Sequence, residues 1–170
     1  MIGHAYEPIR KLTPSDAVQS FDCGDAALNS FLHRFALVSQ QSNSAQTYVC
    51  GYGGSVVGFY SLAVGSVDPA AAAPRVIKGV PRHPVPVMIL ARLAVDLAHQ
   101  RVGLGRALLK DALGRTAQAA DIAGVRALLV HAKDERARNW YLSFDFEPSP
   151  SDPLHLFLLM KDLRAALDQR

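Results

Sequence analysis

The chain has little cysteine and no long apolar run. Cys23 and Cys50 are its only cysteines, and they form no CxxC pair. That usage is typical of a chain in a reducing compartment rather than one held together by disulfides. The first twelve residues lack the apolar core of a signal peptide, and no run of about 18 apolar residues is present to span a membrane. We therefore expect a cytoplasmic protein that does not enter a membrane.

Several common catalytic motifs are absent as well. The six histidines are scattered, and none has the HExxH spacing of a zinc site. No GxSxG marks a serine nucleophile. Cys23 follows Asp22 at an expected helix start, where a thiol pKa is lowered, yet a cysteine in such a place is more often a small buried apolar residue. We expect no metal.

Apolar sequence, by contrast, is abundant. Hydrophobic residues make up 49% of the 170 residues and charged residues 19%. A chain of this length and composition supports one domain with a sizeable core. The net charge of +3 is a mild indication of an anionic partner.

The apolar pattern predicts a fold of the α/β class with a mixed (α+β) sheet. Period-two and continuous apolar runs indicate strands, and spacings of three and four indicate helices. The expected strands are Glu7–Leu12, Gln46–Tyr52, Ser55–Val67, Val87–Val95, Val125–His131 and His155–Met160. The expected helices are Asp25–Val38, the segment that follows Arg106, Asp134–Phe144 and Lys161–Asp168. An early hairpin followed by alternating strands and helices predicts a central sheet of six to seven strands, with helices on both faces.

The segment Asp68–Pro86 departs from this pattern. It contains five prolines, which exclude a long helix or a central strand. It also contains Arg75, Lys78 and Arg82, with no carboxylate after Asp68. Two interpretations remain open: a solvated loop at one end of the sheet, or a basic rim beside the active site.

The segment around which the chain is organised is a strand, a glycine turn and a helix. Val87–Val95 is followed by Gln100-Arg101-Val102-Gly103-Leu104-Gly105-Arg106, and helical spacing begins at once. Glycines let backbone N–H groups approach a ligand, and the first N–H groups of a helix are unpaired at the positive end of its dipole. Such a turn binds an anion, most often a phosphate.

The spacing of the glycines narrows the kind of phosphate site. No Lys-Ser or Lys-Thr follows them, which excludes a P-loop, and the third glycine of GxGxxG is replaced by Leu108. Gln100-x-x-Gly103-x-Gly105 instead resembles the pyrophosphate-binding motif of the GCN5-related N-acetyltransferases (GNAT). This resemblance implies acetyl-CoA as cosubstrate and a single GNAT domain over residues 1–170. It implies that the turn holds the pyrophosphate through Gln100, Arg101, Val102, Gly103, Leu104, Gly105 and Arg106.

The same resemblance assigns a role to the strand before the turn. In that fold this strand splays from its neighbour around Leu93, Ala94 and Val95, and its main chain binds the pantetheine arm as an added strand would. A backbone N–H at Leu93 or Ala94 would then stabilise the oxyanion of the reacting thioester. No base for the amine stands out, although Asp96 and Glu135 are candidates.

Tyr141 is the candidate catalytic acid. Ala137-Arg138-Asn139-Trp140-Tyr141-Leu142-Ser143-Phe144-Asp145-Phe146 resembles the Ala-x-x-Phe-Tyr-x-x-x-Gly-Phe segment of the superfamily, in which the tyrosine is the general acid. When an amine attacks a thioester, the leaving thiolate needs a proton, and a phenol is a donor at neutral pH. Asp145 stands where the family usually has glycine. If that position has a positive φ, aspartate fits it less well than glycine.

The N-terminal half narrows the resemblance further. Phe21-Asp22-Cys23-Gly24, followed by Ala27-Leu28-Asn29-x-Phe31-Leu32, is similar to the signature of the acetyltransferase toxins of type II toxin–antitoxin pairs. Leu90-Ala91-Arg92-Leu93-Ala94-Val95-Asp96 continues the likeness, which covers about Leu12 to Met160. Those enzymes acetylate the α-amino group of aminoacyl-tRNA and thereby block translation.

This narrower resemblance implies partners. A ribbon-helix-helix antitoxin is expected, and a homodimer is compatible with the group. The tRNA would be bound through cations, for which the candidates are Arg34, Arg75, Lys78, Arg82 and Arg92; His33 stands where the toxins often carry more basic charge. Two other functions stay open. One is a GNAT enzyme for a small amine, a peptide or a protein N-terminus, and the other is a non-catalytic module that senses acetyl-CoA.

Overall fold

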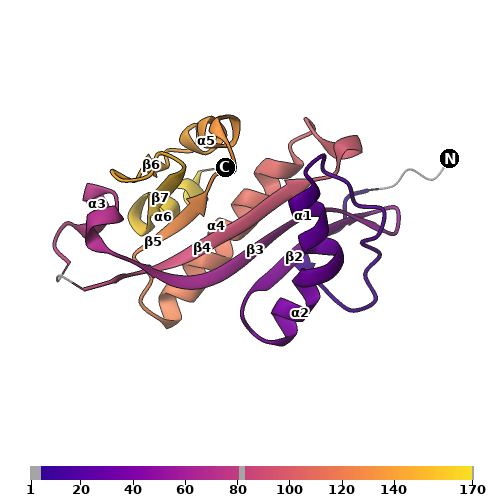
Figure 1. Ribbon diagram of the computed structural model, residues 1–170, viewed down its shortest axis with the longest axis horizontal. Coiled ribbons are helices and arrows are strands. Elements are labelled where there is room, and N and C mark those ends of the chain that lie inside the picture. The colour runs from indigo at the N-terminus through magenta and orange to yellow at the C-terminus, as the bar shows by residue number, and fades with distance from the viewer. Residues whose placement is uncertain (1–4, 81–82, 170) are drawn as a thin grey trace. The chain divides into compact units, whose positions relative to one another are not determined.

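The computed structural model describes residues 5–80 and 83–169. The strands are β1 Arg10–Lys11, β2 Gln46–Tyr52, β3 Ser55–Val67, β4 Val85–Val95, β5 Ala127–His131, β6 Glu147–Pro148 and β7 His155–Leu159. The helices are α1 Ala26–Ser30, α2 Ala36–Gln41, α3 Pro74–Ile77, α4 Leu104–Ile122, α5 Glu135–Leu142 and α6 Met160–Asp168. A π-helical turn, Phe31–Phe35, joins α1 to α2, and short 3₁₀ turns occupy Pro69–Ala71 and Leu97–His99. Figure 1 shows these elements along the chain.

The strands form a mixed seven-stranded sheet in the order β1-β2-β3-β4-β5-β7-β6. β4 and β5 pair in parallel, whereas β1–β2, β2–β3, β5–β7 and β6–β7 pair antiparallel. Parallel neighbours need a long crossover connection, which α4 provides between β4 and β5. The expected fold class, a mixed sheet of six to seven strands with helices, is confirmed.

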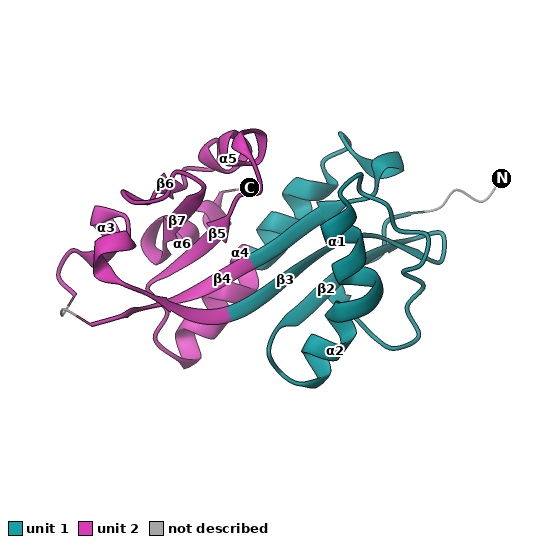
Figure 2. Cartoon of the chain, viewed as in Figure 1, with its two compact units in different colours: residues 1–63, 91–112 teal, residues 64–90, 113–170 magenta. Residues whose placement is uncertain are grey.

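The chain divides into two compact units (Figure 2): residues 1–63 with 91–112, and residues 64–90 with 113–170. In the first unit, helices cover both faces of the sheet. Phe59 packs against Phe21 and Phe31, with ring centroids 5.4 and 6.1 Å apart. The preceding residue, Gly58, faces the other side of the sheet, and a Cβ there would lie 3.0 Å from a Leu108 methyl carbon on α4. Gly58 therefore lets α4 approach the sheet closely.

The core of the second unit includes part of the proline-rich segment. Ala72, Ala73 and Val76 are buried and pack with Val85, Val87, Ala127, Leu129 and Phe157. The Arg126 guanidinium donates to the backbone carbonyls of Val76, at 2.7 Å, and Lys78, at 3.1 Å. Of the two interpretations of Asp68–Pro86, the solvated loop is wrong for this part, because Ala72, Ala73 and, on the short helix α3, Val76 give it a buried apolar face.

Two other boundaries differ from the expected ones. The helix predicted over Asp25–Val38 extends to Gln41 and is interrupted by the π-helical turn, in which the Ala36 N–H donates to the Phe31 carbonyl. The strand predicted over Glu7–Leu12 shrinks to Arg10–Lys11. Pro8 lies between Glu7 and Ile9 and has no N–H to donate to a ladder.

Candidate functional site

The glycine turn before α4 has the backbone of an anion site. Arg101 and Gly103 have φ angles of 65° and 89°. The Gly103 carbonyl accepts a hydrogen bond from the Ala107 N–H, at 3.1 Å, and therefore begins the helix. The N–H groups of Leu104, Gly105 and Arg106 precede this first helical bond and stand at the positive end of the dipole. Alternating backbone conformations of this kind form concavities lined with N–H groups.

Gly103 itself faces open space. A Cβ built there would meet no described atom within 4 Å. A larger residue would thus be disfavoured by the positive φ, and its side chain would occupy the space that a ligand needs.

Gln100 braces the turn from within. Its side-chain amide donates to the carbonyls of Val95, at 2.9 Å, and Cys23, at 3.4 Å. The resemblance placed Gln100 among the ligand-binding residues; in the structure its amide ties the start of the turn to the end of β4 and to the segment before α1.

The residues of the N-terminal signature, Phe21–Leu32, form a network of capping hydrogen bonds next to the segment that Gln100 contacts. The Asp22 carboxylate accepts from the Gly24 N–H and the Asn29 amide, both at 2.9 Å, and these bonds lower its pKa. Asp25 caps α1 by accepting from the N–H groups of Ala27 and Leu28. Asp96 accepts from the Asp22 N–H at 3.0 Å and from the Ala98 N–H at 3.0 Å.

The candidate bases are accounted for by local structure. Both Asp96 oxygens hold backbone N–H groups, so this carboxylate has a structural task. Glu135 is the first residue of α5, whose cap is Asp134 accepting from the Ala137 N–H. A carboxylate in the first turn of a helix is favoured by the dipole.

β4, the strand that precedes the turn, extends beyond the residues that pair with β5. β4 and β5 pair from Val87 with Ala127 to Leu90 with Val130. β4 continues beyond this ladder to Val95. The expected splay around Leu93 begins where the described ladder stops, and the divergence of the two strands stays a prediction.

Tyr141 lies on α5 in the second unit and is 8% exposed. Its ring packs edge-on against Trp140, at 5.0 Å, and Phe146, at 5.4 Å. Burial raises the pKa of its hydroxyl far above the usual value, so the phenol keeps its proton at neutral pH. The structure shows no hydrogen bond from this hydroxyl to any residue that it describes.

Asp145 follows α5 with a φ of 69°, so the position does require a left-handed backbone. Its N–H donates to the Leu142 carbonyl at 3.1 Å and closes the end of the helix. Glycine is the residue that usually fills this position.

The five candidate tRNA-binding cations are divided between the units. Arg34, on the π-helical turn, and Arg92, on β4, belong to the first unit, and Arg75 and Lys78 belong to the second. Arg82 lies outside the described residues. Arg34 is exposed, whereas Arg92 is half-buried.

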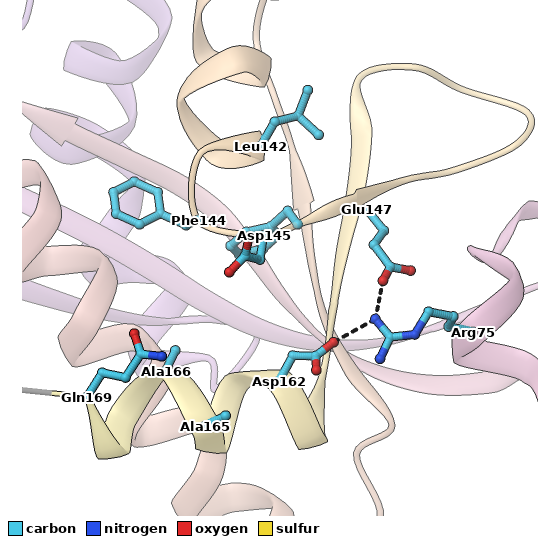
Figure 3. A pocket seen from close by; sticks show the side chains of 10 residues that line it. Arg75, Leu142, Phe144, Asp145, Glu147, Asp162, Ala165, Ala166 and Gln169 are labelled. Atoms are coloured by element: carbon cyan, nitrogen blue, oxygen red, sulfur yellow. Dashed lines mark hydrogen bonds and ion pairs between the residues drawn. The ribbon is translucent and has the colours of Figure 1, made fainter.

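Arg75 is engaged by carboxylates. It forms ion pairs with Glu147 on β6 and with Asp162 on α6, at 2.8 Å to the latter (Figure 3). These bonds tie α3 to two other elements of the second unit. Because these two carboxylates already balance its charge, Arg75 is a weaker candidate for a tRNA-binding residue than the sequence suggested.

The ion pairs of Arg75 line a pocket of about 530 Å³ in the second unit. Its other lining residues are Leu142, Phe144, Asp145, Phe146, Ala165, Ala166 and Gln169. Three carboxylates against one guanidinium make this pocket unsuitable for a phosphate.

Two kinds of feature are absent from the residues that the structure describes. No group of three or more His, Cys, Asp or Glu side chains is arranged to hold a metal ion. Among the helices that the structure describes, none combines the length and apolar character needed to cross a membrane.

Comparison with known proteins identifies the family. The acetyltransferase (GNAT) domain family matches residues 43–148. This chain belongs to the GNAT acetyltransferases. It is 49% identical, over 162 residues, to the tRNA-acetylating toxin of Mycobacterium tuberculosis, with 95% of this chain and 97% of that protein covered. The resemblance to the acetyltransferase toxins is thereby confirmed.

Solved structures agree. AtaT complexed with acetyl-methionyl-tRNAfMet is 27% identical with a TM-score of 0.87, over 95% of this chain and 98% of that one. A tyrosine-to-phenylalanine mutant of AtaT, bound to the C-terminus of the antitoxin AtaR and to acetyl-CoA, is 26% identical with a TM-score of 0.82, over 97% and 99% of the two chains.

Proposed function

We propose that this chain is the toxin of a type II toxin–antitoxin pair, an N-acetyltransferase that moves acetyl from acetyl-CoA to the α-amino group of aminoacyl-tRNA and so blocks translation. One observation carries the proposal: the turn before α4, with positive φ at Arg101 and Gly103 at the start of the helix, lies in a chain that is 49% identical to a tRNA-acetylating toxin.

The turn would bind the pyrophosphate of acetyl-CoA. Backbone N–H groups from Gly103 to Arg106 supply the donors, and the side chains of Arg101 and Arg106 add charge. The main chain of Leu93–Val95 would bind the pantetheine arm, and a backbone N–H at Leu93 or Ala94 would stabilise the developing oxyanion.

Tyr141 would act as the general acid. The amine nitrogen forms a bond to the thioester carbon, the carbon–sulfur bond breaks, and the departing sulfur takes the phenol proton. The ammonium formed on the amine loses a proton to solvent, from which the phenolate is reprotonated. The buried phenol suits this task because it stays protonated and has no other hydrogen bond among the described residues.

The substrate amine needs little help from a base. A free α-amino group has a pKa near 7.7–8.0, so a substantial fraction is neutral at cellular pH. This fits the structural task of Asp96, whose two carboxylate oxygens already accept backbone N–H groups.

The partners follow from the same assignment. AtaT has been solved with acetyl-methionyl-tRNAfMet and with the C-terminus of its antitoxin AtaR. We infer an aminoacyl-tRNA substrate, a ribbon-helix-helix antitoxin and a cytoplasmic location, where charged tRNA is found; a homodimer is compatible with these partners.

Mass spectrometry of a charged tRNA pool after incubation with the protein and acetyl-CoA tests the function. We expect a gain of one acetyl group on the α-amine of the esterified amino acid. Unmodified aminoacyl-tRNA beside acetylated small amines or peptides would contradict the proposal and favour the broader GNAT activity. Binding of acetyl-CoA without any transfer would favour a sensor.

A further inference from the structure

Three aromatic rings meet at His99, the residue that precedes Gln100. The His99 ring lies 4.9 Å from the Tyr52 ring and 5.6 Å from the Tyr6 ring, centroid to centroid, and the two tyrosine rings are 4.9 Å apart. The Tyr6 hydroxyl and the His99 Nδ1 atom form a hydrogen bond of 2.8 Å. All three residues belong to the first unit. This contact therefore connects the N-terminal segment, residues 5–11, to the start of the glycine turn.

The backbone around Tyr6 places it for this contact. Tyr6 forms an isolated antiparallel bridge with Tyr52, and the Glu7 N–H donates to the Gly51 carbonyl at 2.8 Å. Gly51 leaves room for this segment, because a Cβ there would clash with the Glu7 carboxylate. Tyr6 is nevertheless 42% exposed, so its ring adds little to the hydrophobic core. Its directional contact is the hydrogen bond to His99.

The turn that follows His99 needs support of this kind. Arg101 has a positive φ although it carries a Cβ. Such a conformation persists only where the surrounding contacts determine it, and it is common where a ligand is held. Gln100 is held through its side-chain amide, as described above. His99 is held through its N–H, which donates to the Asp96 carbonyl at 2.9 Å, and through its ring, which contacts the two tyrosines.

We propose that Tyr6 is a positioning residue for acetyl-CoA: through His99 it holds the glycine turn in the conformation that binds the pyrophosphate. Tyr52 supports this contact by packing against both rings. The inference rests on the proposed function and adds a residue of the N-terminal segment to the machinery that binds the cosubstrate. A turn that is ordered before its ligand arrives costs less free energy to order on binding, so the effect is on affinity rather than on the chemical step.

Calorimetric titration and steady-state kinetics give the first test. Tyr6→Phe keeps the ring and removes one hydrogen bond, so Kd and KM for acetyl-CoA should rise roughly three- to tenfold. The kcat and the KM for aminoacyl-tRNA should stay at their wild-type values. An unchanged Kd for acetyl-CoA would overturn the proposal.

Arg10→Gln is the matched control. It loosens the same N-terminal segment at the ion pair between Arg10 and Asp16 rather than at His99. Its Kd for acetyl-CoA should equal that of the wild type. A rise as large as that of Tyr6→Phe would show that any loosening of the segment weakens binding, and it would overturn the specific role of Tyr6.

A shorter acetyl donor shows whether the effect passes through the turn. S-acetylpantetheine carries the thioester but has no pyrophosphate. With this donor, kcat/KM of Tyr6→Phe should equal that of the wild type, although the same variant is impaired with acetyl-CoA. An equal loss with both donors would place the effect elsewhere in the site and overturn the proposal.

A double-mutant cycle tests the link to His99. His99→Phe keeps a ring beside Tyr52 and removes the nitrogen that bonds to Tyr6. Because both single variants remove the same hydrogen bond, the Kd of Tyr6→Phe/His99→Phe should be no higher than that of the weaker-binding single variant. Losses that multiply would show that the two residues act independently, and they would overturn the link.

Hydrogen exchange separates positioning from general stability. In Tyr6→Phe without ligand, the amides of residues 97–107 should exchange faster than in the wild type, while those of α5, which carries Tyr141, should be unchanged. Faster exchange throughout the chain would mean that Tyr6 serves the stability of the whole fold, and it would overturn the positioning role.

These outcomes are distinct from a failure of the proposed function. A wild type that acetylates aminoacyl-tRNA, beside a Tyr6→Phe variant with unchanged Kd for acetyl-CoA, overturns only the role of Tyr6. A wild type that does not acetylate aminoacyl-tRNA overturns the function itself.

Discussion

Tyr141 is the residue on which the chemistry depends most directly. We predict that Tyr141→Phe lowers kcat by about 10²–10⁴-fold, because the leaving sulfur loses its proton donor. The ring stays in place between Trp140 and Phe146, so the Kd for acetyl-CoA should not change. Single-turnover transfer and calorimetric titration measure the two quantities. A variant that still arrests growth at the wild-type rate would exclude Tyr141 as the acid.

Burial of the same phenol predicts an alkaline effect on stability. The folded state raises the pKa of Tyr141, so folding favours the protonated form. The resulting stabilisation is fully present below the unfolded-state pKa of about 10 and is lost as pH rises toward the higher folded-state value. We expect the free energy of unfolding to fall less steeply above pH 10 in Tyr141→Phe than in the wild type. Urea titrations at a series of pH values compare them, and parallel curves would contradict the expectation.

The backbone conformation of Asp145 lowers the free energy of unfolding. Its φ of 69° is disfavoured for a residue with a Cβ, and the backbone bond to Leu142 does not need the side chain. We predict that Asp145→Gly raises the free energy of unfolding by about 0.5–1 kcal/mol, after the greater freedom of glycine in the unfolded chain is allowed for. Thermal unfolding measures it, with Asp145→Ala as the control that should destabilise. A less stable glycine variant would mean that the carboxylate compensates for the strain.

Residues whose task is local were the most predictable from sequence. The sequence motifs around Gly103 and Asp145 indicated that both positions favour glycine because of their backbone conformation, and the structure gives both a positive φ. Gln100 and Asp96 were not predictable in the same way, because their partners, Cys23 and Asp22, lie more than seventy positions away in the chain. Contacts between residues so far apart in the chain leave no periodic pattern in the sequence from which they could be predicted.

At the scale of elements, α1 depends on its cap. The Asp25 side chain accepts from the N–H groups of Ala27 and Leu28, which have no helical partners. We predict that Asp25→Ala lowers the free energy of unfolding by about 1 kcal/mol, while Asp25→Ser and Asp25→Asn stay close to the wild type. Chemical denaturation measures the difference. Equal losses in all three variants would assign the effect to the charge rather than to the cap.

Element type was more predictable than element detail. Apolar spacing indicated one helix over Asp25–Val38 and could not reveal the π-helical turn, since one inserted residue leaves Phe31, Leu32 and Ala36 on the buried side. Prolines in Asp68–Pro86 argued for a loop, but burial of Ala72, Ala73 and Val76 decided the outcome. Those contacts come from strands that are distant in sequence.

At the scale of the molecule, the two compact units share their longest elements. β3, β4 and α4 each run from one unit into the other, so neither unit is a continuous piece of chain. We propose that residues 1–170 are a single domain, and we predict one calorimetric unfolding transition whose van't Hoff and calorimetric enthalpies agree.

Acetyl-CoA at one hundred times its Kd should stabilise the whole chain by about 2.7 kcal/mol, which corresponds to a rise in melting temperature of roughly 5–11 °C. Gly103→Val should keep the single transition and lose most of that rise, because its side chain fills the open space at the turn. Two transitions, of which the ligand moves only one, would show that the units unfold separately and that binding reports on one of them alone.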